Sequence, residues 1–140
     1  MKIAIGCDHG GLSLKDEIVT LLQSLGHTVD DKGCFSTESV DYPDFAKAVC
    51  TQLQNNNCER GILICGTGVG MSMVANRFEG IRAALGNELF TAQMSREHND
   101  ANVLCLGARV IGPGLAAEIV RIWVSTEFAG GRHQRRIDMF

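Results

Sequence analysis

Blocks of apolar and polar positions alternate along the chain, and their spacing predicts strands and helices in turn. Short apolar runs typical of buried strands occupy residues 2–7, 27–31, 61–65, 81–86 and 101–107. Apolar residues at helical spacing follow over residues 14–25, 45–53, 71–78 and 88–97, and a last long helix is predicted to begin at Pro113. This alternation predicts an α/β fold, with a mostly parallel five-stranded sheet between two layers of helices.

Length, composition and charge narrow the class of protein. A chain of 140 residues, 45% hydrophobic and 21% charged, is expected to form one globular domain over residues 1–140. The net charge of −3 argues against generic nucleic-acid binding, which depends on neutralising phosphates. No apolar run approaches the ~20 residues that span a bilayer, and no signal peptide is evident, so a cytoplasmic protein is expected. The six cysteines include no Cys-x-x-Cys pair and are expected to be reduced.

The segment around Cys65 is the strongest candidate for chemistry. A buried strand is predicted to end at Cys65, and Gly66, Gly68 and Gly70 follow at alternate positions before the next helix. Such a loop exposes N–H groups that bind negative charge, and a thiol facing them gains thiolate character. We therefore favour a functional role for Cys65 over that of a buried structural thiol.

Three other glycine-rich loops do not fit this spacing. A dinucleotide-binding loop needs a third glycine where Met71 stands, and a Walker loop needs a Gly-Lys-Ser/Thr motif that is missing. A cysteine phosphatase loop needs an arginine six residues after the cysteine, and this position is again Met71.

Polar residues also follow other strands of the predicted sheet. Asp8 and His9 come after the first strand and Arg109 after the fifth, so the carboxyl ends of parallel strands should bring them beside Cys65. Asp8 could simply cap a turn and His9 could be a surface residue. The functional alternative is that both hold sugar hydroxyls or a phosphate.

Two further segments carry candidate residues. His98 lies in a His-Asn-Asp triplet before the fifth strand; it is either part of an ordinary loop or a proton donor working near neutral pH. Residues 130–136 form a basic cluster in an otherwise acidic protein. There Arg132 and Arg136 are four residues apart, so a helix would place both on one face, and with Arg109 they suit a phosphate. The segment 130–140 is either a solvated tail or, as we favour, an arm that docks on a second subunit.

Five segments together resemble the ribose-5-phosphate isomerase type B family, which includes galactose-6-phosphate isomerase subunits. They are residues 6–9, 41–43, 64–70, 98–103 and 130–136. The resemblance implies a Rossmann-like α/β/α sandwich and a homodimer or dimer of dimers with active sites shared across the dimer. It also implies neither a metal nor an organic cofactor, and a sugar phosphate, not a nucleic acid or a membrane, as the partner.

The resemblance also implies roles for individual residues. Cys65 matches the catalytic base, His98 the residue that opens the sugar ring, and Thr67 a position near the reacting carbons. Asp8 matches a sugar-contacting position, and in the mechanism we expect it to assist His98. The matches to substrate-binding positions are His9, Tyr42, Gly66, Gly68, Val69, Gly70, Asn99, Arg109, Arg132 and Arg136.

The implied activity is the interconversion of D-ribose 5-phosphate and D-ribulose 5-phosphate through a cis-enediolate. Some family members have serine at the cysteine position and use a glutamate of the next helix; residues 71–78 contain no carboxylate, so the cysteine branch fits better. The alternatives are an isomerase of a six-carbon sugar phosphate, such as allose or galactose 6-phosphate, and a non-catalytic sugar-phosphate sensor. A redox or thiol-transfer protein is disfavoured. Such a protein would be expected to have a resolving cysteine near Cys65 and would not need the basic segment at residues 130–136.

Overall fold

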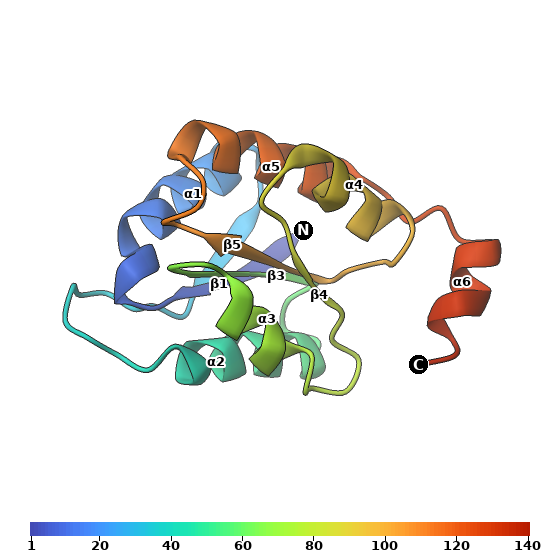
Figure 1. Ribbon diagram of the computed structural model, residues 1–140, viewed down its shortest axis with the longest axis horizontal. Coiled ribbons are helices and arrows are strands. Elements are labelled where there is room, and N and C mark those ends of the chain that lie inside the picture. Colours follow the sequence, from blue (N-terminus) through green and yellow to red (C-terminus); the bar gives the residue numbers. More distant parts are fainter.

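The computed structural model describes residues 1–140 and contains a single five-stranded sheet (Figure 1). All neighbouring strands are parallel, and their order is β2-β1-β3-β5-β4. The strands are β1 (Lys2–Cys7), β2 (Thr28–Asp31), β3 (Arg60–Cys65), β4 (Ala83–Leu85) and β5 (Val103–Gly107). The predicted three-layer α/β/α sandwich with a Rossmann-like parallel sheet is confirmed.

Helices cover both faces of the sheet, and the short helix α6 lies outside the layers. Figure 1 shows α1, α4 and α5 on one face and α2 and α3 on the other. The helices are η1 (His9–Gly11), α1 (Leu12–Ser24), α2 (Tyr42–Gln54), α3 (Val69–Ala75), α4 (Leu89–Glu97), α5 (Pro113–Ser125) and α6 (Arg132–Ile137). No helix is both long enough and apolar enough to cross a membrane.

The central strands are buried on both faces, and alternate residues enter different cores. Ile62 and Ile64 pack in the core formed with α1 and α5, whereas Leu63 and Cys65 pack in the core formed with α2 and α3. All six cysteines are buried and unpaired. Cys65 is the last residue of β3, and its side chain packs on the face of the sheet that α2 and α3 cover. The thiol therefore lies beside the loop that leads from β3 into α3.

Two predicted strands are shorter than expected, and at their amino ends the Asn102 side chain adds hydrogen bonds to backbone groups. The Asn102 side chain accepts a hydrogen bond from the Arg82 amide at 2.8 Å and donates one to the Gly80 carbonyl at 2.8 Å. Residues 81–82 and 101–102 lie outside the strands, and β4 and β5 begin two residues later than predicted.

Helix α3 is also displaced from its predicted range of residues 71–78. It begins at Val69, directly after Gly68 with φ +78°, and ends at Ala75. The Asn76 side chain then exchanges two 2.9 Å hydrogen bonds with the backbone of Ala83, which redirects the chain into β4.

Candidate active site

Cys65 ends β3 and is 6% exposed. The Gly68 amide donates a hydrogen bond to the Cys65 Sγ at 3.1 Å. Gly68 makes this bond from a left-handed backbone (φ +78°), which glycine adopts without strain. The end of β3 thus places a backbone N–H donor directly on the sulfur.

The rest of the loop leaves backbone donors unused. The amides of Gly66, Thr67 and Gly70 donate to no other group of the chain, while the Val69 amide bonds the Thr67 Oγ1 at 3.3 Å. These free N–H groups belong to the loop that directly follows Cys65, so they are available for an oxyanion that binds at this loop.

The loop after β5 holds the loop after β3 in place. The amides of Ala108 and Arg109 donate to the carbonyls of Cys65 and Gly66, both at 2.9 Å. Gly107 packs so closely that a Cβ there would lie 2.7 Å from the Thr67 carbonyl oxygen. The position of the loop after Cys65 therefore depends on a glycine that the sequence patterns did not select, and glycine has no side chain that could have revealed the contact.

Asp8 and His9 stand at the same edge, directly after β1. The Asp8 Oδ1 accepts hydrogen bonds from the Gly10 and Gly11 amides at 2.9 and 3.2 Å, so Asp8 caps the turn, as its simpler interpretation predicted. The His9 Nδ1 accepts a hydrogen bond from the Val40 amide at 3.2 Å. With Nδ1 as acceptor, neutral His9 carries its proton on Nε2, where it can donate to a ligand.

Tyr42 and Arg109 complete this edge of the sheet. A Cβ on Gly70 would lie 2.7 Å from the Tyr42 ring, so the ring rests against the loop backbone. The Arg109 side chain passes within 3.5 Å of the corresponding point at Gly66 and within 3.7 Å of that at Gly10. The structure thus brings together the segments predicted to meet at the carboxyl ends of β1, β3 and β5.

The remaining predicted site residues lie at the opposite edge of the sheet. His98 caps the end of α4 and precedes β5, whereas Cys65 pairs with the last residue of β5, Gly107. Val103 to Gly107 spans four steps of about 3.3 Å, so about 13 Å of strand separates the two edges. Asn99 follows His98, and the structure does not bring either residue to Cys65 of the same chain.

The arginines of α6 accompany His98. Its ring stacks on that of His133 with centroids 4.2 Å apart and planes 7° apart. Arg132 and Arg136 belong to the same helical segment as His133. Desolvation, and then the positive charges of His98, Arg132 and Arg136, lower the pKa of His133. Sequence reasoning selected the arginines but missed His133, although it lies within the same basic cluster.

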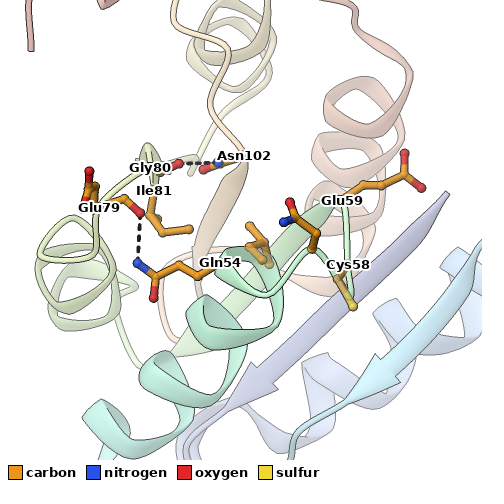
Figure 2. Close-up of a pocket in the computed structure, with 9 residues that line it drawn as sticks. Gln54, Cys58, Glu59, Glu79, Gly80, Ile81 and Asn102 are labelled. Atoms are coloured by element: carbon orange, nitrogen blue, oxygen red, sulfur yellow. Dashed lines mark hydrogen bonds between the residues drawn. The ribbon is translucent and has the colours of Figure 1, made fainter.

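The large cavities of the chain lie away from Cys65. A cavity of about 620 Å³ opens at the amino ends of β3 and β5, where Gln54 bonds the Glu79 carbonyl and Asn102 bonds the Gly80 carbonyl (Figure 2). Its lining includes Glu59 and Glu79 but no lysine, arginine or histidine, so it lacks the charge that binds a phosphate. No cluster of three His, Cys, Asp or Glu side chains is placed to hold a metal ion.

Comparison with known proteins identifies the family. Residues 3–140 match the family model described as Ribose/Galactose Isomerase. The chain is 51% identical over 137 residues to ribose-5-phosphate isomerase B of Escherichia coli K12, covering 98% of this chain and 92% of that protein. It is 44% identical over 139 residues to D-erythrulose-4-phosphate isomerase of Pectobacterium atrosepticum, covering 99% and 91%.

A solved structure agrees with these relatives. The structure of ribose-5-phosphate isomerase B from Clostridium thermocellum superposes with a TM-score of 0.98 at 52% identity, covering 99% of this chain and 94% of that one. The chain therefore belongs to the ribose/galactose isomerase family. The predicted resemblance is confirmed, and with it the predicted enzyme class, an aldose–ketose isomerase of sugar phosphates.

Proposed function

We propose that this chain interconverts D-ribose 5-phosphate and D-ribulose 5-phosphate with Cys65 as the base. The observation that carries the proposal is the Cys65 thiol, which accepts the Gly68 N–H at 3.1 Å inside a loop where the amides of Gly66, Thr67 and Gly70 are free. A base beside unoccupied oxyanion donors is what proton abstraction next to a carbonyl requires.

The reaction is divided between the two groups of residues. His98, assisted by Asp8, protonates the ring oxygen and opens the sugar to its aldehyde. The Cys65 thiolate then removes the C2 proton, and the negative charge that develops on the carbonyl oxygen is held by the amides of residues 66–70, beside Thr67. Return of the proton to C1 completes the isomerisation, and each preorganised donor contributes ~3–4 kcal/mol to lowering the barrier.

The substrate phosphate is held remotely from this chemistry. The His9 Nε2–H and the Arg109 guanidinium lie on the Cys65 side, and Arg132 and Arg136 lie on α6. A guanidinium group can bind two phosphate oxygens at once. Because the phosphate does not react, the energy of binding it can be used to orient the reacting carbons. Tyr42 and Asn99 contact the sugar hydroxyls.

We infer that each complete site combines two copies of the chain. This assembly is supported by the separation of Cys65 from His98, since about 13 Å of strand prevents both from reaching one sugar within a single chain. It is also supported by exposed apolar side chains on and beside the edge strand β4, which a second copy would cover: Val69, Met73, Leu85, Leu89 and Phe90. A homodimer, or a dimer of dimers, follows.

The direct test is proton NMR of the enzyme with ribose 5-phosphate in D2O. Formation of ribulose 5-phosphate with deuterium entering the sugar is expected, because the proton taken by the base exchanges with solvent. Binding without conversion would favour the sensor alternative and contradict the proposal.

The length of the sugar is a separate question with a specific reason to ask it. One 44%-identical relative is named D-erythrulose-4-phosphate isomerase, and the family description includes galactose. We expect kcat/KM to be highest for the five-carbon phosphate when four-, five- and six-carbon phosphates are compared. A higher value for either of the others would reassign the substrate and leave the roles of Cys65 and His98 intact.

A further inference from the structure

The turn that carries His98 and Asn99 is built more rigidly than a helix end requires. Asp100 closes it in a left-handed conformation (φ 46°), and its amide donates to the Arg96 carbonyl at 3.1 Å. Asparagine or glycine serves this backbone role as well as aspartate does. The carboxylate of Asp100 therefore needs an explanation beyond the local backbone.

Two arginines grip the Asp100 carboxylate from opposite sides. The Arg82 Nη2 lies 2.9 Å from Oδ2, and the Arg96 Nη1 lies 2.8 Å from Oδ1. Arg82 also donates to the carbonyls of Asn99 at 3.0 Å and Asp100 at 3.0 and 3.1 Å. The backbone directly after His98 is thus fixed by charge-assisted hydrogen bonds, the strongest kind available to it.

Arg96 is itself fixed by the interior. It is 4% exposed, donates to the Ala101 carbonyl at 2.7 Å and the Thr126 carbonyl at 3.3 Å, and lies 5.9 Å from the centre of the Trp123 ring. The clamp therefore connects the turn to the core and not merely to the surface.

We propose that Asp100, clamped between Arg82 and Arg96, is a positioning residue that holds the His98–Asn99 turn ready for the second copy's Cys65 site. This inference rests on the proposed function. Asp100 touches no substrate; it acts through His98, whose distance from the ring oxygen sets the rate of ring opening. A misplacement of about 1 Å can cost about 100-fold in rate, so a rigid turn matters for catalysis.

The first test substitutes each side of the clamp. Asp100→Asn retains the shape of the side chain but removes its charge, and Arg82→Gln removes the half-exposed guanidinium without disturbing the buried Arg96. Each variant is expected to lose about 10- to 100-fold in kcat/KM. Glu118→Gln is the matched control, because it breaks an exposed carboxylate–arginine pair on α5 and should keep wild-type activity. Folded Asp100→Asn and Arg82→Gln variants with wild-type kcat/KM would overturn the proposal.

The second test separates positioning from general damage by mixing defects in one dimer. Asp100→Asn and Cys65→Ala chains are co-expressed with different tags, and the heterodimer is purified through both. One of its two sites combines an intact Cys65 with an intact turn, so about half of the wild-type turnover should return. If Asp100 instead supported the fold of its own chain's Cys65 loop, both sites would stay defective and the proposal would fail. Arg82→Gln replaces Asp100→Asn if the latter does not fold.

A His98→Ala and Cys65→Ala heterodimer distinguishes this inference from the proposed function. Recovery in that pair without recovery in the Asp100 pair refutes the role of Asp100 alone. Failure of the His98 pair refutes the shared site, and the role of Asp100 fails with it.

Discussion

Gly107 shows how one missing side chain determines where the loop after Cys65 lies. A Cβ at this residue would meet three backbone atoms of Thr67 at 2.7, 2.8 and 2.9 Å, and backbone cannot rotate away as a side chain can. The contact transmits the position of β5 to the loop that holds the Cys65 thiol.

Gly107→Ala is therefore expected to lower kcat by about 10-fold or more, because the loop amides move relative to the reacting carbons. Overpacking should also cost about 1–3 kcal/mol in the free energy of unfolding. Steady-state kinetics and urea denaturation measure the two effects. Gly114→Ala, where nothing lies within 4 Å of the new Cβ, is the control and should be neutral or slightly stabilising. Unchanged kcat in Gly107→Ala would contradict the role given to this contact.

Cys65→Ala is expected to fold normally and lose most turnover. The side chain is buried at the end of β3, but it is small, and its main polar contact is the Gly68 amide, which the loop can expose to water. Turnover with ribose 5-phosphate and the far-UV circular dichroism spectrum measure the outcome. A fully active Cys65→Ala variant would mean that another group is the base.

Residue patterns predicted one edge of the site better than the whole site. Cys65, Asp8 and Arg109 follow strands of a parallel sheet, so counting strands was enough to place them together. His98 precedes a strand, so the same rule places it at the opposite end of the sheet, and the α6 arginines follow α5, where the rule does not apply. In the proposed dimer they meet Cys65 of a second copy, and no periodicity within one chain predicts such a contact.

At the scale of elements, Arg60 links the start of β3 to the end of α5. Its Nη1 donates to the carbonyls of Trp123 and Val124, both at 3.0 Å, and its guanidinium lies 5.4 Å from the Trp123 ring centre. Arg60 thus satisfies carbonyls that the end of α5 leaves without an intrahelical partner. Burial, and then the charge of Arg96, lower the pKa of Arg60.

Arg60→Met should cost about 2–3 kcal/mol in the free energy of unfolding, because two buried carbonyls lose a charged donor. Chemical denaturation followed by circular dichroism gives the value. Arg121→Met on the solvent side of α5 is the comparison, since its pair with Glu118 is exposed and should change stability by less than about 1 kcal/mol. Equal losses in the two variants would show that the α5 cap contributes little.

The predicted ends of β4, β5 and α3 were wrong at places where asparagine side chains bond the backbone. The sequence pattern assigned residues 81–82 and 101–102 to strands because they are flanked by apolar runs. Asn76 instead bonds the backbone of Ala83, and Asn102 bonds the backbone of Arg82. The sequence does not show which backbone group an asparagine side chain will contact.

For the whole molecule, the buried thiols make stability depend on alkaline pH. Burial raises the pKa of Cys50 to about 11 from 9.0 and also raises the pKa values of Cys7, Cys58 and Cys105. Above pH 9 the unfolded chain releases thiol protons that the folded chain keeps, so the folded state loses relative stability as pH rises.

The free energy of unfolding should therefore fall between about pH 9 and 11, by up to about 1.4 kcal/mol per pH unit for each such thiol. Denaturation at pH 7, 9 and 10.5 under reducing conditions measures this slope. Cys50→Ala should have a shallower slope than the wild type. Identical slopes would exclude Cys50 as a contributor.

The placement of His98 and Cys65 at opposite edges of the sheet also has a consequence for how the enzyme behaves on dilution. If, as proposed, each chain holds half of each of two sites, a single chain has little turnover, so specific activity should fall once the concentration drops below that at which chains stay paired. Ribose 5-phosphate would bridge the two chains and so oppose this loss. The concentration of ribose 5-phosphate would then affect the fraction of chains that are paired and active.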